Sequence, residues 1–149
     1  PPAGRRRRQP RPARRLGRLN GHRTVQVTRI YTGDDGCSHF EDLELPVTLS
    51  EIGRLSGAIA TRTVFFRDTS EGSPEVMDFH VAPRRQFVLH LRGRAEIEVG
   101  DGTKRQFGPG DLLLADDTTG QGHISREVEG PRLQLFAVLA DGVDLDAWR

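Results

Sequence analysis

The stretch FHVAPRRQFVLHLRGRAEIEVGDG, residues 79–102, decides the fold expected for this chain. Two strand-like segments, 85–93 and 94–100, meet at a glycine and end in a Gly-Asp-Gly turn. Side chains of a strand alternate between its two faces. In an unbroken strand, residues 80, 82, 86, 88 and 90 would therefore share one face, with two histidines and a glutamine on it. The opposite face, at residues 79, 81, 87, 89 and 91, is wholly apolar. We expect the polar face to line the interior of a barrel, unless the Pro-Arg-Arg segment at 83–85 bulges and changes the register.

The rest of the chain extends this pattern. Short segments of strand character recur every eight to twelve residues, with turn residues between them, which is typical of an antiparallel sandwich or barrel. Residues 48–60 alone have helical character, with Ser50 as a candidate cap and two glycines that weaken the helix. The expected strands are 24–30, 62–67, 74–82, 85–93, 94–100, 103–110, 111–116, 122–128 and 132–140, and a turn is expected at 33–36.

Charge divides the chain into a tail, residues 1–23, and a domain, residues 24–149. The tail holds nine arginines and no acidic residue, and the domain then carries 13 basic and 21 acidic residues, a formal charge of −8. A segment this poor in apolar residues cannot offset its ordering entropy by burial, so we expect it to be disordered. An extension without a role is the favoured interpretation, and a nucleic-acid-binding arm is the less favoured one.

Composition limits the classes of protein that fit. One cysteine, Cys37, excludes an internal disulfide framework and a cysteine-rich zinc site. No apolar run approaches the roughly 18 residues of a membrane span, and none follows the N-terminal arginines as in a secretory signal. A cytoplasmic protein without membrane contact is expected. The excess of 21 arginines over a single lysine indicates a GC-rich, bacterial genome.

Two motifs carry a family resemblance. Gly93 follows His80 and Gln86 at the spacing of a His-x-His, Glu and Gly pattern, and GPGD at 108–111 precedes His123 by about a dozen residues. With these motifs, residues 63–139 resemble a small single-domain cupin, a jelly-roll barrel of bacterial type. The chain departs from the pattern at two of its four ligand positions, where Ala82 replaces a histidine and Gln86 replaces the glutamate.

The resemblance implies a metal site held by His80, Gln86 and His123, with Fe, Mn, Zn or Ni as the candidate ions. Gln86 contributes a neutral amide oxygen, which does not offset the charge of a divalent ion. Asp116 or Asp117 is the candidate source of a carboxylate. His90 lies about 13 Å along the strand from Gln86, too far to share one ion with it unless the strand bulges.

Other residues are candidates for contact with a small-molecule ligand. His90, Arg84, Arg85 and Asp116 are expected at the pocket or its rim, where the arginines could receive an anionic substrate. Against each stands a structural alternative: a hydrogen-bonded interior histidine, solvated rim charges, and a turn held by Asx-type bonds.

Two functions from different classes remain open. One is an enzyme of oxygenase or isomerase/cyclase type, in which a metal or a histidine base acts on a small organic substrate. The other is a binding protein that holds a small molecule without metal or catalysis. The fold does not choose between them. The surplus of apolar residues in 79–91 and 133–139 predicts a homodimer.

Overall fold

A computed structural model describes residues 17–19 and 22–149, and the side chains from residue 24 onward. Nearly every element is a strand, and no helix within the described part has the length and apolar character to cross a membrane. The elements are β1 (Gly17–Leu19), β2 (His22–Thr32), β3 (Ser38–Ser50), β4 (Gly53–Leu55), β5 (Thr61–Asp68), β6 (Val76–His80), β7 (Gln86–Glu98), β8 (Lys104–Phe107), β9 (Leu112–Asp116), β10 (His123–Leu139) and the 3₁₀ helix η1 (Asp146–Trp148).

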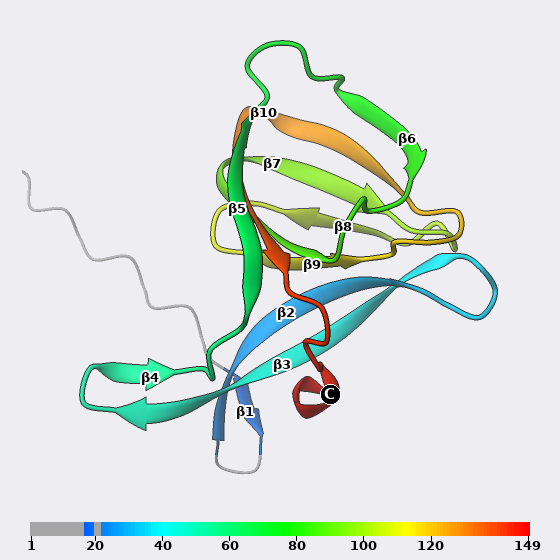
Figure 1. Ribbon diagram of the computed structural model, residues 1–149. Helices are drawn as coiled ribbons and strands as arrows, with labels where there is room; N and C mark the ends of the chain where they lie inside the picture. The colour runs from blue at the N-terminus through cyan, green and yellow to red at the C-terminus, as the bar shows by residue number, and fades with distance from the viewer. Residues whose placement is uncertain (1–16, 20–21) are drawn as a thin grey trace, which may run out of the picture.

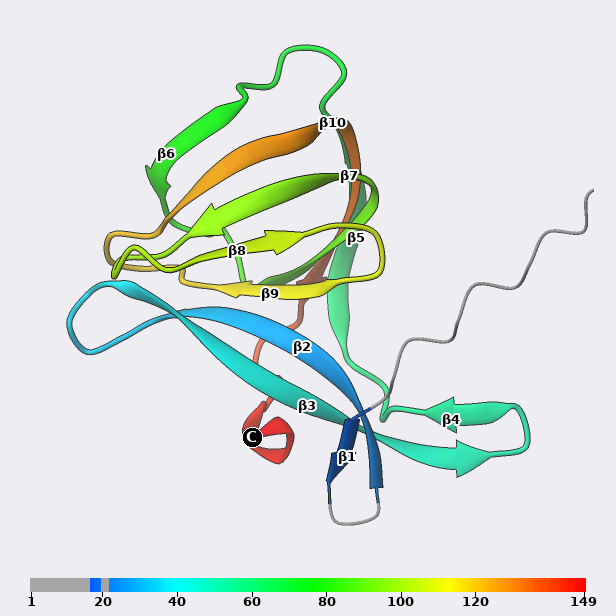
Figure 2. The ribbon, with the colours of Figure 1, turned by 180° about the vertical axis from the view of Figure 1, so that it is seen from behind.

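The strands form one strongly curved sheet in the order β4-β3-β2-β9-β7-β10-β5, with β1, β6 and β8 attached to β2, β10 and β7. Strands β5 to β10 curl around a common interior, and the long β2–β3 hairpin crosses beneath them (Figure 1). Seen from behind, η1 lies against the side of that hairpin (Figure 2). Pairing is antiparallel as predicted, except that β2 and β9 run parallel. The all-β barrel expected from the sequence is confirmed.

Two strands are longer than predicted. Residues 85–93 and 94–100 belong mostly to one strand, β7, which passes through Gly93 with a φ of 78°. A Cβ on Gly93 would lie 2.6 Å from the carbonyl oxygen of Glu129, so only glycine lets β7 and β10 approach this closely. Residues 122–128 and 132–140 likewise join in β10, whose register with β7 shifts between Glu127 and Gln134.

Residues 48–60, the one stretch with helical character in the sequence, do not form a helix. Residues 48–50 end β3 and pair with β4 across a tight turn, with Ser50 opposite Gly53. Gly53 has a φ of 121°, which is incompatible with a helix and is reached readily only by glycine. The Ser50 hydroxyl donates to the carbonyl oxygen of Gly53 at 2.7 Å and so closes the hairpin instead of capping a helix.

Part of the predicted tail is ordered. Residues 17–19 pair with the start of β2, with Gly17 opposite Thr24 and Leu19 opposite His22. The backbone of β2 offers hydrogen bonds to this segment whatever its side chains are, which a compositional argument does not take into account. The remaining tail residues, 1–16 and 20–21, lie outside the described residues.

Two apolar clusters fill the two faces of the β7–β9 wall. Residues that are adjacent in sequence belong to different clusters. Val88 and Leu113 point into the barrel, whereas Phe87 and Leu114 point toward the β2–β3 hairpin and η1. The second cluster absorbs much of the apolar surplus noted in 79–91 and 133–139. Its buried members are Val27, Leu43, Phe87, Leu114, Leu139, Leu145 and Trp148, and the first cluster comprises Ile30, Ala82, Val88, Ile97, Val99, Phe107, Leu113 and Ala115.

Candidate functional site

A cavity of about 250 Å³ lies inside the barrel. Its floor is apolar and belongs to the first cluster, and its walls carry three histidines, two glutamines, two arginines and one serine. The strand-face argument therefore identified a true interior face, although the strand it assumed is broken between β6 and β7. The polar lining residues are Arg67, His80, Gln86, His90, His123, Ser125, Arg132 and Gln134.

His80 and His123 form a cross-strand pair in the wall of the cavity. They oppose each other in the register of β6 and β10, and their ring centroids are 4.5 Å apart. The close approach expected from the motif spacing is present, although the residues are 43 positions apart in sequence. Gly122 makes it sterically feasible, since a Cβ there would overlap the carbonyl group of His80.

His123 is held by a buried carboxylate. Its Nδ1 lies 2.6 Å from Oδ2 of Asp117, a side chain with no solvent exposure. The hydroxyl of Ser38 donates to the same oxygen at 2.8 Å. Because a carboxylate accepts here, His123 donates from Nδ1, and Nε2 is left as the nitrogen available to the cavity.

His80 has the same orientation by a different route. Its Nδ1 donates to the backbone carbonyl of Asp78 at 2.7 Å, which leaves Nε2 available. Burial lowers the pKa of His80 and outweighs the hydrogen bond to the Asp78 carbonyl, which raises it. The neutral imidazole is therefore favoured at His80.

A second polar group lies deeper in the cavity. His90, 3% exposed, receives a hydrogen bond of 3.2 Å at Nε2 from Nε2 of Gln134. Burial, and next the charge of Arg132, lowers the pKa of His90 to about 4. Three buried polar atoms here have no hydrogen-bond partner: Nδ1 of His90 and the Oε1 atoms of Gln86 and Gln134. Unpaired buried atoms of this kind are costly, so they mark where a ligand could bond.

Arg67 and Arg132 were missed by the sequence argument, yet both line the cavity. Arg67 follows a segment of β5 that is exposed, and Arg132 follows the cis Gly130–Pro131 bond in a predicted turn. An arginine beside a turn is expected at the surface. Arg132 lies inside only because β10 folds across the barrel.

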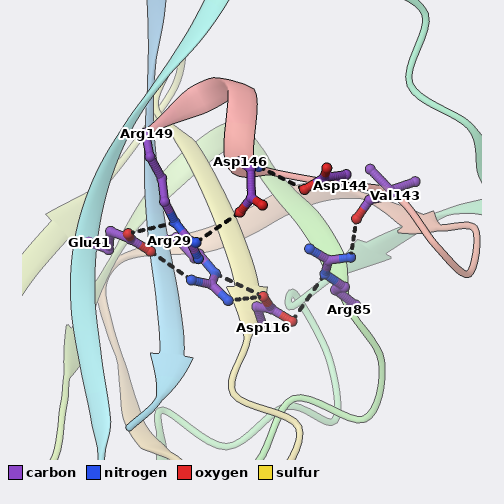
Figure 3. Close-up of polar contacts among 8 residues, drawn as sticks. All are labelled: Arg29, Glu41, Arg85, Asp116, Val143, Asp144, Asp146 and Arg149. Atoms are coloured by element: carbon purple, nitrogen blue, oxygen red, sulfur yellow. Dashed lines mark hydrogen bonds and ion pairs between the residues drawn. The ribbon is translucent and has the colours of Figure 1, made fainter.

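The predicted rim residues do not line this cavity. Arg85 and Asp116 belong to an ion-pair network on the opposite side of the wall, in which Asp116 also binds Arg29 (Figure 3). Arg85 further donates to the carbonyl oxygen of Val143, so the network fastens the C-terminal segment to the barrel. Arg84 lies over the ring of Phe65, 5.7 Å from its centroid. Arg84 and Arg85 lie in the loop of residues 81–85, between β6 and β7, and Asp116 ends β9.

The donors in the cavity fit a resident divalent metal poorly. Two imidazole nitrogens and the amide oxygen of Gln86 are all neutral. Asp117 binds His123 and Ser38 through Oδ2, while its buried Oδ1 has no hydrogen-bond partner among the described residues. Over the described residues, no group of three or more His, Cys, Asp or Glu side chains is arranged to hold an ion. Catalytic zinc sites use three protein ligands, and a non-haem iron site adds a carboxylate to two histidines.

Comparison with known proteins gives distant likenesses. No family model matches the chain, and no curated protein matches it. It is similar to the crystal structure of a Cupin 2 conserved barrel domain protein from Salinispora arenicola, at 17% identity over 93% of this chain and 92% of that one, with a TM-score of 0.33. It is also similar to a Ralstonia eutropha protein assigned provisionally as a mannose-6-phosphate isomerase, at 16% identity over 78% and 86%, with a TM-score of 0.30. The strand order described above is that of an all-β barrel, as the sequence predicted.

Proposed function

We propose that the barrel binds a small organic molecule in its cavity and that His123 moves a proton on it. The observation that carries the proposal is the contact of 2.6 Å between Nδ1 of His123 and the buried carboxylate of Asp117. This contact fixes the tautomer and the ring orientation, so that a lone pair on Nε2 is presented to the ligand. A carboxylate behind the ring also stabilises the imidazolium that forms when the proton is taken.

The proposed reaction needs no metal. Nε2 of His123 removes a proton from the ligand, and the electron pair of the broken bond stays on the ligand. The proton then returns from Nε2 to the same atom or to another one, which gives exchange or isomerisation without any net change in protons. His80, neutral and facing His123, is the second group able to accept or return that proton.

Deuterium incorporation tests the proposal without knowledge of the product. A panel of small hydroxy acids, keto acids and sugars is incubated with the protein in D₂O, and each compound is examined by mass spectrometry. We expect at least one compound to gain deuterium at carbon with the wild-type protein and to lose this gain with His123→Asn. His39→Asn is the matched control, because His39, at the start of β3, pairs with Asp35 of the preceding turn and lies outside the cavity.

The alternative is a binding protein without catalysis. It is favoured if some compounds raise the melting temperature of the protein but no compound gains deuterium at carbon. Exchange that persists in His123→Asn would contradict the role of His123.

A further inference from the structure

We propose that the ligand is a small organic monocarboxylate whose carboxylate is bound by Arg67 and Arg132. The inference rests on the proposed function only in placing the ligand in the same cavity. It adds a substrate class, and its evidence comes from Arg67 and Arg132, which form no hydrogen bond or ion pair with Asp117 or His123 among the described residues.

Arg132 is the main element of the site. The residue is 2% exposed, and it lines the cavity. Its Nε donates to Oε1 of Glu127 at 2.9 Å, and its backbone N–H donates to the hydroxyl of Thr69 at 2.7 Å. Within the described chain, no hydrogen bond or ion pair uses its two Nη groups. A buried guanidinium with one edge fixed and the other unused is arranged for two-point binding of a carboxylate.

Arg67 supplies a second cation without a carboxylate of its own. Its Nη2 donates to the hydroxyl of Ser73 at 2.7 Å, and no Asp or Glu of the described residues pairs with it. Burial lowers the pKa of Arg67, and the nearby charge of Arg132 lowers it further, whereas the charge of Glu127 raises it. Glu127 hydrogen-bonds to Arg132 but not to Arg67, so a second anion close to both guanidinium groups would be favoured.

The balance of charge indicates a single negative charge on the ligand. No Asp or Glu lines the cavity. Glu127 accepts from Arg132 and from the Thr69 hydroxyl, so it offsets one of the two arginines. His80 and His90 both have lowered pKa values and add no charge at neutral pH. The charges that act on Arg67 are those of Arg132 and Glu127, and not that of Asp117, whose Oδ2 accepts from His123 and Ser38. One arginine charge is thus left beside Arg67 and Arg132, which a monocarboxylate neutralises and a phosphate dianion exceeds.

The rest of the cavity limits the size and the chemical character of the rest of the ligand. Its volume of about 250 Å³ equals roughly eight waters at about 30 Å³ each. The rings of Phe65 and Phe136, stacked 4.9 Å apart, border it with apolar surface. The unpaired Oε1 atoms of Gln86 and Gln134 accept a hydrogen bond, so a hydroxyl on the ligand would complete the site.

Paired ligands that differ only in charge test the inference. Lactate and 3-hydroxybenzoate are each compared with their neutral amides by calorimetry near neutral pH, with phenyl phosphate as the phosphate arm. For at least one pair, we expect the acid to bind the wild-type protein at least about tenfold more tightly than the amide. Arg67→Met should reduce this preference to less than about threefold. Arg84→Met is the matched control and should retain it, because Arg84 lies outside the cavity over Phe65.

Arg132→Lys gives a second variant in case loss of a buried arginine prevents folding. It retains the charge and removes the fork, so the preference should fall while the protein remains folded. Equal binding of acid and amide, an unchanged preference in Arg67→Met, tighter binding of phenyl phosphate, or no acid binding below about 10 mM would each overturn the inference.

The outcomes separate this inference from the proposed function. His123→Asn should keep the preference for the acid, since His123 is not part of the anion site. A preference that depends on Arg67, without deuterium exchange in any ligand, leaves the anion site standing and removes the proton-transfer function. Deuterium exchange in a neutral ligand, without binding of either acid, supports the proton-transfer function and removes the anion site.

Discussion

Asp117 and His123 make a buried carboxylate–imidazole contact of 2.6 Å, whereas Asp35 and His39 make an exposed one of 2.9 Å in the same chain. The two pairs have the same chemistry and differ in solvent access. They therefore allow the cost of removing a carboxylate to be measured with and without burial in one protein.

Asp117→Ala should lower the free energy of unfolding by about 2–4 kcal/mol, because it leaves Nδ1 of His123 and the Ser38 hydroxyl without an acceptor. Asp35→Ala should change it far less, since water replaces the lost partner. Urea denaturation measures both. Equal effects of the two substitutions would show that the Asp117 contact is not built as described.

His90 should make the protein less stable in mild acid. The unfolded chain protonates this residue near pH 6.5, whereas the folded protein does so only near 4, because burial and Arg132 disfavour the charge. The stability from this residue is complete above about pH 6.5 and is lost as the pH falls from there toward 4. Between about pH 7.5 and 5, unfolding free energy should drop by roughly 1–2 kcal/mol more in the wild-type protein than in His90→Gln. A His39→Gln variant should behave like the wild type, and an identical drop in His90→Gln would refute the assignment.

Metal content decides between the metal-dependent and metal-free hypotheses. Protein purified without added metal should carry less than about 0.1 equivalent of Fe, Mn, Zn or Ni by mass spectrometry, because the cavity offers too few anionic donors. A chelator should leave the melting temperature unchanged. One equivalent of a metal that disappears in His80→Ala or His123→Ala would reinstate the metal site of His80, Gln86 and His123.

The homodimer remains a prediction, now placed at β5. This strand ends the sheet, and it exposes Val64 and Phe66 at 54% and 62%. An apolar edge strand is a template for pairing with a second copy. Light scattering at tens of micromolar should give twice the chain mass, and Phe66→Glu should give a monomer. Ile52→Glu, in the turn after β3, is the control that should remain dimeric, and a monomeric wild type would end the hypothesis.

The N-terminal segment should be dispensable up to β1. Removing residues 1–16 should shift the melting temperature by less than about 5 °C, on the order of 1 kcal/mol for a domain of this size. Removing residues 1–21 also deletes β1 and its pairing with β2, so it should cost more. A larger loss on the first truncation would show that the basic segment packs on the domain.

Local patterns predicted the strands well and the site only partly. The alternation around Val88 and His90 identified an interior face, because period two is a property of any strand. Residues 48–60 do not form a helix because Gly53 has a positive φ, which the neighbouring residues in the sequence do not predict. Arg132 and the Ser38–Asp117 bond could not be found, since they depend on how residues 63 and 79 positions apart meet in the folded sheet.

The hydrogen bond between Ser38 and Asp117 offers a way to monitor ligand binding. Cys37, the chain's single cysteine, precedes Ser38 and is partly exposed, next to Gly100 and Gln121. A fluorine label on its sulfur would be attached uniquely, without engineering of any other residue. Its NMR signal would report from the residue that precedes Ser38, whose hydroxyl binds the carboxylate that orients His123, and should therefore change when a ligand enters.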